Sequence, residues 1–491
     1  ALLYFLYYNL IMDNHFDVLV VGAGISGIGA GYHLQTKCPG KSYAILEGRE
    51  TIGGTWDLFR YPGIRSDSDM YTLGFSFYPW KEKEAIADGP AILNYLHETS
   101  ENFNIKEKIK FGHYVESASW SSDDSQWKLK VKSKEKTEIM TCNFIFMCSG
   151  YYSYKEGYTP DFEGINDFNG QIVHPQKWTT DINYVDKNVI VIGSGATAVT
   201  IVPEVAKKAK HVTMLQRSPT YVVSAPQKDP IASLLQSFLP TKAAYFIVRW
   251  KNILRQHWFF RLCKSNPKRV KDFILSQIRK ELGPDYDIEK HFTPNYNPWD
   301  QRMCLVPNGD LFESINNKKA SIVTDEINCF TRNGIKLKSG DELAADLVVT
   351  ATGLNMELLS NIDLIVDKSK IDLSNTVTYK GMMFSGVPNL VSTFGYTNAS
   401  WTLGADLTSE YVCRLLNLME KKSVTKCCPE ANESIEKDEN WLNLSSGYIE
   451  RSKDIFPKQG KEKPWKNNQN FIKDIFQIRY GDLKDDDMKF S

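Results

Sequence analysis

The sequence lacks an excess of charge of either sign, CxxC cysteine pairs, and an apolar run long enough to cross a membrane. Its 59 Lys and Arg residues balance 59 Asp and Glu residues, so the formal net charge of +0 predicts no global attraction to nucleic acid. Among nine cysteines only Cys427 and Cys428 are adjacent, which argues against a disulfide framework and a zinc site. We therefore expect a reducing, cytoplasmic location and a small-molecule partner, with peripheral membrane contact left open.

The first eleven residues, ALLYFLYYNLI, are apolar and aromatic but do not form a convincing anchor. They lack a basic segment, a small-residue cleavage site and the roughly 20 residues needed to span a bilayer. Because the chain begins with Ala1 and Met12 immediately precedes a strand-like run, we expect residues 1–11 to be a non-native extension and Met12 to be the natural start.

Two stretches repeat the pattern of a β-strand, a glycine-rich turn and a helix. Residues 16–21 and 26–34 predict the first strand and helix, and residues 43–46 predict a second strand that leads to Glu47. The pattern restarts at residue 188 with NVIVI, a helix to about residue 208, and the strand HVTML. With 491 residues the chain is longer than one domain, which usually has roughly 150 residues around a single hydrophobic core. The predicted fold class is α/β, with two Rossmann-like dinucleotide-binding domains.

The first glycine turn, GAGISG, predicts a site for a dinucleotide pyrophosphate. Gly22 and Gly24 leave room for the tight turn and for an anion at the helix N-terminus, and Gly27 allows close packing of helix and strand. Glu47 lies about 20 residues further on, the spacing at which an acidic side chain accepts hydrogen bonds from a ribose.

The second turn, GSGATA, ends differently. Its residues are Gly193, Ser194, Gly195, Ala196, Thr197 and Ala198. The strand that follows leads to Arg217 and Ser218 rather than to an acid. A guanidinium binds a 2′-phosphate through charge-assisted hydrogen bonds, so this site favours NADPH over NADH; a solvated surface arginine is the alternative.

Residues 226–298 have a helical period and are rich in Leu, Phe, Trp, Arg and Lys, which predicts a helical insertion. Its helices are expected either to be buried in a bundle or to form an apolar surface that borders the site of an apolar substrate or contacts a membrane. After Lys421 the sequence becomes polar and charge-dense, which predicts peripheral structure with a mobile end.

The run FNGQIVHPQKWT stands just before the second glycine turn. Phe168, Gly170, His174 and Trp178 match the FxGxxxHxxxW core of the Baeyer–Villiger monooxygenase fingerprint, so the chain resembles that family of class B flavoprotein monooxygenases. Thr179 stands where the family pattern closes with Pro or Asp, a departure that concerns the local turn. By the resemblance His174 links domains rather than transferring protons; as a lone residue it would be a structural histidine.

The resemblance extends from about residue 12 to the C-terminus and is strongest to a subgroup of mycobacterial ethionamide-activating enzymes. It includes the stretch GGTWDLFRYPGIRSDSDMY, which is similar to the flavin-side loop of the family. The residues that it implies for FAD are Ser26, Glu47, Gly54, Thr55, Trp56, Asp57, Leu58 and Asp67, with Val115 near the adenine. Arg65, Ser66 and Asp67 would also meet the nicotinamide. The alternative is that these motifs are simple turns and Trp56 a core aromatic.

The expected division follows from the motifs and the resemblance together. Residues 12–155 and 354–491 would form the FAD-binding domain with the C-terminal region, residues 156–225 and 301–353 the NADP-binding domain, and residues 226–300 the helical insertion within it.

Arg302, in NPWDQRMCLVP, matches the active-site arginine of the family. The resemblance implies that NADPH reduces bound FAD, that O2 forms a C4a-peroxyflavin held by Arg302, and that Asp67 orients this arginine. One oxygen atom would pass to an apolar ketone, giving an ester or lactone, or to a sulfur compound. Without the resemblance, Arg302 would be a surface ion-pair member and Asp67 a turn former.

Two other functions stay open. One is a flavin-containing monooxygenase restricted to nitrogen and sulfur oxygenation, whose related fingerprint generally lacks a Trp at position 178. The other is a non-catalytic, nucleotide-gated redox sensor. A disulfide reductase is disfavoured because no CxxxxC pair follows the first glycine turn.

Overall fold

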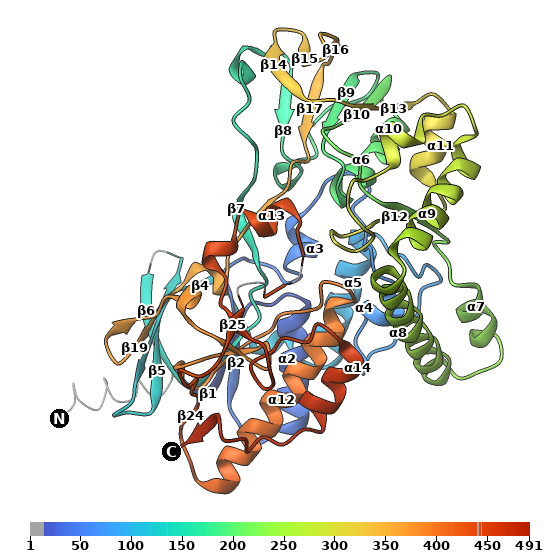
Figure 1. Ribbon diagram of the computed structural model, residues 1–491. Coiled ribbons are helices and arrows are strands. Elements are labelled where there is room, and N and C mark those ends of the chain that lie inside the picture. Colours follow the sequence, from blue (N-terminus) through green and yellow to red (C-terminus); the bar gives the residue numbers. More distant parts are fainter. Residues whose placement is uncertain (1–13, 135, 439–440, 443) are drawn as a thin grey trace.

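The structure is a computed structural model that describes residues 14–134, 136–438, 441–442 and 444–491. The expectations for residues 1–11 and Met12 lie outside the described residues. The chain forms two α/β units, with a helical layer beside the second unit and a C-terminal segment that returns to the first (Figure 1).

The first unit is built on a nine-stranded sheet. Its order is β20-β19-β4-β5-β6-β1-β2-β3, with β23 paired to β6. The strands are β1 (His15–Val21), β2 (Tyr43–Glu47), β3 (Ile109–Phe111), β4 (His113–Ser121), β5 (Gln126–Ser133), β6 (Lys136–Met147), β19 (Asp363–Val366), β20 (Ser369–Lys370) and β23 (Leu390–Ser392). β1 pairs in parallel with β2 on one side and with β6 on the other. The carboxyl end of β1 therefore becomes a switch point, where nucleotides bind in such sheets.

The two faces of β1 bury alternate side chains. Val18 and Val20 pack into a core with helices α2 (Ile25–Lys37), α5 (Gly89–Asn102) and α12 (Trp401–Lys422). Leu19 and Val21 pack into a second core with Trp127 of β5. A strand buried on both faces must be apolar throughout, which is why the run VLVV predicts it so well.

The second unit is a five-stranded parallel sheet of order β13-β10-β9-β17-β8. Its strands are β8 (Gln171–Val173), β9 (Asn188–Ile192), β10 (His211–Gln216), β13 (Ala320–Thr324) and β17 (Leu347–Thr350), and helices α6 (Ala196–Ala206) and α11 (Asp310–Asn316) pack against it. The predicted fold class, α/β with two Rossmann-like units, is confirmed. The exact domain boundaries stay a prediction.

The predicted helical insertion consists of α7 (Pro230–Gln236), α8 (Thr241–Ser265), α9 (Pro267–Leu282) and α10 (Ile288–Phe292). α8 buries one face, which includes Tyr245 and Val248, and leaves the other face in solvent. The expectation of a buried bundle helix therefore describes one face of α8, and the expectation of an exposed apolar surface describes the other face. In the part of the chain that is described, no helix combines the length and apolar character needed to cross a membrane.

Two antiparallel strands, β7 (Tyr152–Gly157) and β18 (Leu354–Met356), connect the units. The remaining short elements are α3 (Thr55–Leu58), α4 (Met70–Leu73), β11 (Val222–Ala225), β12 (Cys304–Pro307), β14 (Ile327–Thr331), β15 (Gly334–Leu337), β16 (Glu342–Ala344), β21 (Thr378–Tyr379), β22 (Met383–Phe384), β24 (Cys427–Pro429), β25 (Lys437–Asp438), α13 (Gly447–Glu450), β26 (Gln459–Gly460), α14 (Phe471–Asp474) and β27 (Met488–Phe490).

The prediction of a mobile C-terminal end is wrong for the described residues. β27 pairs with β24, and Ile475, Ile478 and Met488 are buried in the same core as β1. The segment is polar on average, but some of its apolar side chains reach the core, while others such as Phe476 stay exposed.

Candidate functional site where two clefts meet

The N-terminus of α2 opens into a cleft of about 700 Å³ at the carboxyl end of β1. Gly22 has a φ of 102°, and a Cβ on Gly54 would lie 3.1 Å from the Cα of Gly24. Within the described chain no side chain caps α2, so its first amides remain available. Amides and a helix dipole that face a cleft form a suitable site for a pyrophosphate.

Gly27 allows α2 to pack closely against the preceding turn and does not line the cleft. A Cβ at this position would lie 1.8 Å from the carbonyl oxygen of Gly22, so only glycine lets the helix approach the strand. Gly27 is not among the residues that line the cleft.

Glu47 ends β2 and lines the cleft. Its carboxylate accepts hydrogen bonds from the backbone N–H of Ala23, at 2.7 Å, and of Arg49, at 2.9 Å. Burial raises the pKa of Glu47, although both N–H donors oppose the shift. The side chain is thus fixed in the position where the sequence predicts a ribose contact.

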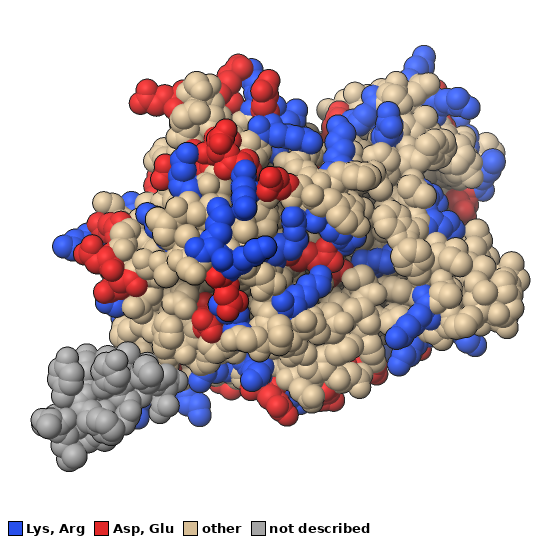
Figure 2. Space-filling model, turned by 90° about the horizontal axis from the view of Figure 1, so that it is seen from below, with Lys and Arg blue, Asp and Glu red and all other residues tan. Residues whose placement is uncertain are grey.

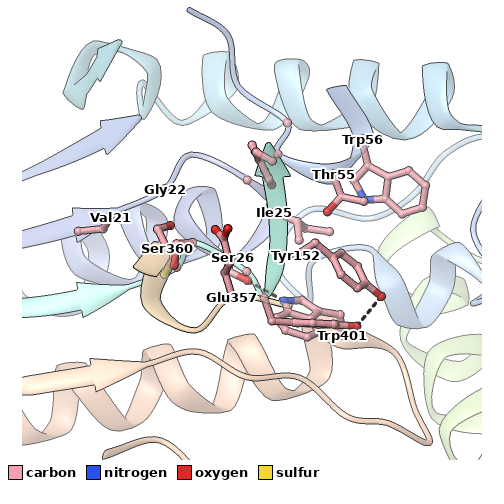
Figure 3. A pocket seen from close by; sticks show the side chains of 18 of the residues that line it. Val21, Gly22, Ile25, Ser26, Thr55, Trp56, Tyr152, Glu357, Ser360 and Trp401 are labelled. Atoms are coloured by element: carbon pink, nitrogen blue, oxygen red, sulfur yellow. Dashed lines mark hydrogen bonds between the residues drawn. The ribbon is translucent and has the colours of Figure 1, made fainter. Parts of the chain in front are cut away.

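The other residues that the resemblance implies for the cofactors divide into those that line the cleft and those that support it. The first group is Ser26, Gly54, Thr55, Trp56, Ser66, Asp67 and, from β4, Val115. Figure 3 shows Thr55 and Trp56 from α3 beside the α2 turn. Asp57 and Leu58 do not line the cleft; the Asp57 carboxylate is held between Arg49 and Arg60. Arg65 pairs with Asp310 at the start of α11, away from either cleft.

Several cleft residues are absent from the sequence predictions. Tyr151, Tyr152 and Trp401 line the cleft, and the hydroxyl groups of the two tyrosines are 2.9 Å apart. Figure 3 shows Tyr152 and Trp401 in this cleft. The Trp401 indole N–H donates to Ser26 Oγ at 2.7 Å. The tyrosines come shortly after the end of β6, so the rule that ligands bind at strand ends could have found them. Trp401 begins a helix more than 300 residues after the first turn, and no local pattern indicates it.

A second cleft of about 660 Å³ lies at the N-terminus of α6. Gly193 has a φ of 133°, while a Cβ on Gly195 would meet no heavy atom of the described chain within 4 Å. The cleft is lined by Gly193, Ser194, Gly195, Ala196, Thr197, Arg217 and Ser218. Ala198 lies behind the turn and is fully buried. The hydroxyl of Ser194 donates to the carbonyl of Ser218 at 3.0 Å, which ties the turn to the end of β10.

Arg217 is exposed in this cleft and faces acidic residues as well. Asp325 and Glu326 line the same cleft, and the pKa of Glu326 is lowered by Lys338 first and by Arg217 to a smaller extent. Arg451, from the C-terminal segment, places its guanidinium 3.6 Å from the ring centre of Tyr158 in the same wall. Arg217 and Arg451, together with Arg302, therefore offer three cations to an anionic ligand in this cleft.

The two clefts share Asp67, Tyr152 and Arg302. Arg302 Nη2 lies 4.0 Å from Asp67 Oδ2, and the carboxylate raises the pKa of Arg302 further above its usual value. Burial raises the pKa of Tyr448, which also lies beside Arg302, to about 12. The guanidinium is therefore a permanent positive charge at the junction of the clefts, and burial keeps Tyr152 and Tyr448 beside it neutral at ordinary pH by raising the pKa of each.

The fingerprint residues lie outside both clefts. Phe168 packs against Phe330, and Trp178 is buried in the core of the second unit. A Cβ on Gly170 would lie 2.6 Å from the carbonyl oxygen of Asp346. At Thr179 the chain turns, with its carbonyl accepting from the Ile182 N–H at 3.4 Å.

His174 contacts both connecting segments. Its Nε2 lies 3.0 Å from the carbonyl oxygen of Gly353, beside β18, and its ring packs on Gly157 at the end of β7. Burial lowers the pKa of His174. These contacts are those of a neutral residue that holds the two segments together.

Two Rossmann-like units, each with a helix N-terminus that opens into a cleft, and clefts that meet at an arginine are the arrangement expected of a two-nucleotide oxidoreductase. The chain belongs to the flavin-binding monooxygenase-like family, whose model matches residues 17–278. It is 53% identical over 98% of its length to the FAD-containing monooxygenase EthA of Mycobacterium tuberculosis (strain CDC 1551 / Oshkosh), of which it also covers 98%. The resemblance and the enzyme class predicted from the sequence are confirmed.

Solved structures show the same fold. A steroid monooxygenase bound to NADP superposes with a TM-score of 0.78 at 21% identity, over 97% of this chain and 99% of that one. A cyclohexanone monooxygenase with bound ε-caprolactone superposes with a TM-score of 0.75 at 19% identity, over 97% and 100%.

Proposed function

We propose that this flavin monooxygenase binds FAD in the first cleft and NADPH in the second, and that it transfers one oxygen atom from O2 to an apolar ketone or to a sulfur compound. The observation that carries the proposal is the position of Arg302, which lines both clefts next to Asp67. A residue in that position can contact both cofactors and the reacting oxygen.

The first cleft fits FAD. The glycine turn and open amides of α2 would hold the pyrophosphate, and Glu47 would accept hydrogen bonds from a ribose. Tyr152 and Trp56 line the same cleft as Arg302, and their rings suit the flat ring system of a flavin. The name of the EthA relative, a FAD-containing monooxygenase, supports the same choice.

The second cleft fits NADPH. The amides at the start of α6 would hold its pyrophosphate, and Arg217 at the end of β10 would bind a 2′-phosphate. The steroid monooxygenase of the same fold is described as bound to NADP, which supports the choice.

When bound, reduced flavin supplies the electrons that activate O2 for the transfer of one oxygen atom. The task of Arg302 is to stabilise negative charge that develops on oxygen in the closed cleft. A guanidinium suits this task because it donates hydrogen bonds without losing its proton. Asp67 holds Arg302 in place and keeps it charged.

The substrate side of Arg302 is apolar. A small cavity of about 10 Å³ next to it is lined mainly by Met356, Phe394, Trp401, Leu442 and Ile449, together with tyrosines. Such a wall favours an apolar molecule with one polar group directed at the guanidinium. The cavity is too small for a substrate as it stands, so its walls must move apart to admit one.

The proposal is tested with purified protein and NADPH in the absence of air, followed by oxygen and a panel of linear and cyclic ketones and sulfides. We expect a yellow cofactor that NADPH bleaches, and esters, lactones or sulfoxides after air is admitted. Sulfoxides with no ester from any ketone would identify an enzyme restricted to nitrogen and sulfur oxygenation. A colourless protein that FAD cannot reconstitute would overturn the proposal.

A further inference from the structure

The outward face of α8 carries a continuous stripe of apolar side chains. Phe246, Leu254 and Trp258 are 61%, 55% and 64% exposed, although large apolar residues on a soluble surface usually occur singly. With half-buried Trp250 they follow one another at intervals of four residues, so they lie along one side of the helix.

The neighbouring helix extends this surface. α7 packs against α8, and Ile231, Leu234 and Phe238 in and after it are 49%, 62% and 62% exposed. We call the surface formed by Ile231, Leu234, Phe238, Phe246, Leu254 and Trp258 the α7–α8 face. In Figure 2 the right-hand side of the molecule, where these helices lie, is largely uncharged, and the charged side chains around it are mainly Lys and Arg.

The charged residues within α7 and α8 are all basic. α7 and α8 contain no Asp or Glu, and the basic residues of α8 are Lys242, Arg249, Lys251, Arg255, Arg261 and Lys264. Lys242 precedes the stripe by one turn, Arg255 lies beside it, and Arg261 follows Trp258 by three residues. These three are exposed, and in the described part of the chain none of them forms an ion pair. A chain whose net charge is +0 thus concentrates free positive charge around one apolar surface.

Packing fixes this face outward. The opposite side of α8 buries Tyr245, and Arg249 there donates to the carbonyls of Tyr71 and Gly74 at 2.8 and 2.7 Å. The helix cannot rotate its stripe into the protein without breaking these bonds. The stripe is therefore a permanent surface that only an external partner can cover.

We propose that the α7–α8 face docks the protein on an anionic lipid surface, with the apolar side chains in the boundary between headgroups and acyl chains. Trp and Phe favour that boundary, and Lys and Arg side chains beside them reach the lipid phosphates. A second copy of the chain is a poorer partner, because two such faces would bring Lys242, Arg255 and Arg261 of each copy together. The basic residues within α8 also require it to lie on the membrane rather than across it.

The test is the flotation of the full-length protein with vesicles of phosphatidylcholine alone, or of phosphatidylcholine with phosphatidylglycerol. We expect binding to the anionic vesicles that weakens as salt is added, and little binding to the neutral vesicles. Arg255→Gln and Arg261→Gln should each weaken binding about fivefold, because each basic side chain near an anionic membrane contributes about 1 kcal/mol to binding. Phe246→Glu with Trp258→Glu should abolish it.

The matched control is Ile139→Glu. Ile139 is 56% exposed but lies on β6, far along the chain from the α7–α8 face, so this variant should bind as the wild type does. Thermal unfolding of each variant shows that it is folded before it is compared. The proposal is overturned by absence of binding to anionic vesicles, by equal loss in the Ile139→Glu control, or by a wild-type dimer that Phe246→Glu with Trp258→Glu converts to a monomer. Since no turnover is measured, the result is independent of the substrate.

Discussion

Arg302 lies where the two clefts meet. It stands between the two clefts, next to one carboxylate and three tyrosines, and Asp67 raises its pKa further above its usual value. The partners Asp67 and Arg302 are far apart in sequence, and no spacing rule connects them. Only the likeness to a known family indicated the pair, and the structure shows that the two side chains do meet.

We expect Arg302→Ala to retain flavin but to lower the rate of oxygen transfer by roughly 100-fold or more, since a lost donor to a developing oxyanion costs about 3 kcal/mol. Arg302→Lys should restore part of the rate because it keeps the charge without the planar donor pair. Steady-state product formation and flavin content measure the two effects separately. Unchanged product formation in Arg302→Ala would remove Arg302 from the reaction.

Arg217 should decide between the two nicotinamide cofactors. Its side chain is exposed in the second cleft, free to meet a 2′-phosphate. Arg217→Ala should raise the KM for NADPH roughly 10- to 100-fold, because it removes a charged hydrogen bond that contributes about 1.5–3 kcal/mol to binding. The KM for NADH should stay almost unchanged, because NADH has no 2′-phosphate. An equal rise for both cofactors would show that Arg217 supports the cleft rather than the phosphate.

The residues that sequence reasoning missed were missed for different reasons. Tyr151 and Tyr152 could have been found, because they follow a strand that was predicted and strand ends meet at the site. Tyr448 and Arg451 could not, because they come from a polar segment with no periodic pattern, and only the fold brings them to the clefts. Asp57 and Arg65 are a different case. The resemblance implied that both contact the cofactors, whereas in the structure Asp57 pairs with Arg49 and Arg65 pairs with Asp310.

At the scale of elements, the two strand–turn–helix units were predicted well because each strand is buried on both faces and therefore apolar throughout. The glycines of these two turns nevertheless have different physical roles. Gly27 is required for packing, since any Cβ would meet a backbone oxygen at 1.8 Å. Gly195 has open space around it and a negative φ, so alanine fits the protein there without strain.

Because a methyl group fits the protein at Gly195, a substitution there can test cofactor binding without a loss of stability. We expect Gly195→Ala to leave the unfolding temperature within about 2 °C of the wild type, because the new methyl group meets nothing. The same methyl group would occupy the space of a pyrophosphate at the start of α6, so NADPH affinity should fall roughly tenfold or more.

Gly40→Ala is the matched control for this variant, since the space around Gly40 is equally open and Gly40 lines neither cleft. Calorimetric titration with NADPH and thermal unfolding provide the two readouts. Undiminished NADPH affinity in Gly195→Ala would argue against the second cleft as the pyrophosphate site.

At the scale of the whole molecule, the function depends on how two units that each have their own core are held in register. The direct connections are β7 and β18, and His174 is hydrogen-bonded or packed against both. Its Nδ1 accepts from the Gln176 N–H at 3.2 Å, so the proton resides on Nε2, which donates to Gly353. The imidazole is neutral in this arrangement, and a second proton would break the bond to Gln176.

The half-buried His174 should therefore make stability depend on pH. Its pKa lies below the usual 6.5 in the folded protein because of burial, whereas the unfolded chain restores the usual value. The unfolded state consequently takes up the proton first as pH falls, so the contribution of His174 is complete above 6.5 and is lost as pH falls through the lower, folded value. We expect the unfolding temperature of the wild type to fall between about pH 8 and about pH 5 by more than that of His174→Gln, which keeps a side-chain donor and cannot titrate. Tryptophan fluorescence during heating measures both; an identical pH dependence in the two proteins would show that His174 is not the group that responds.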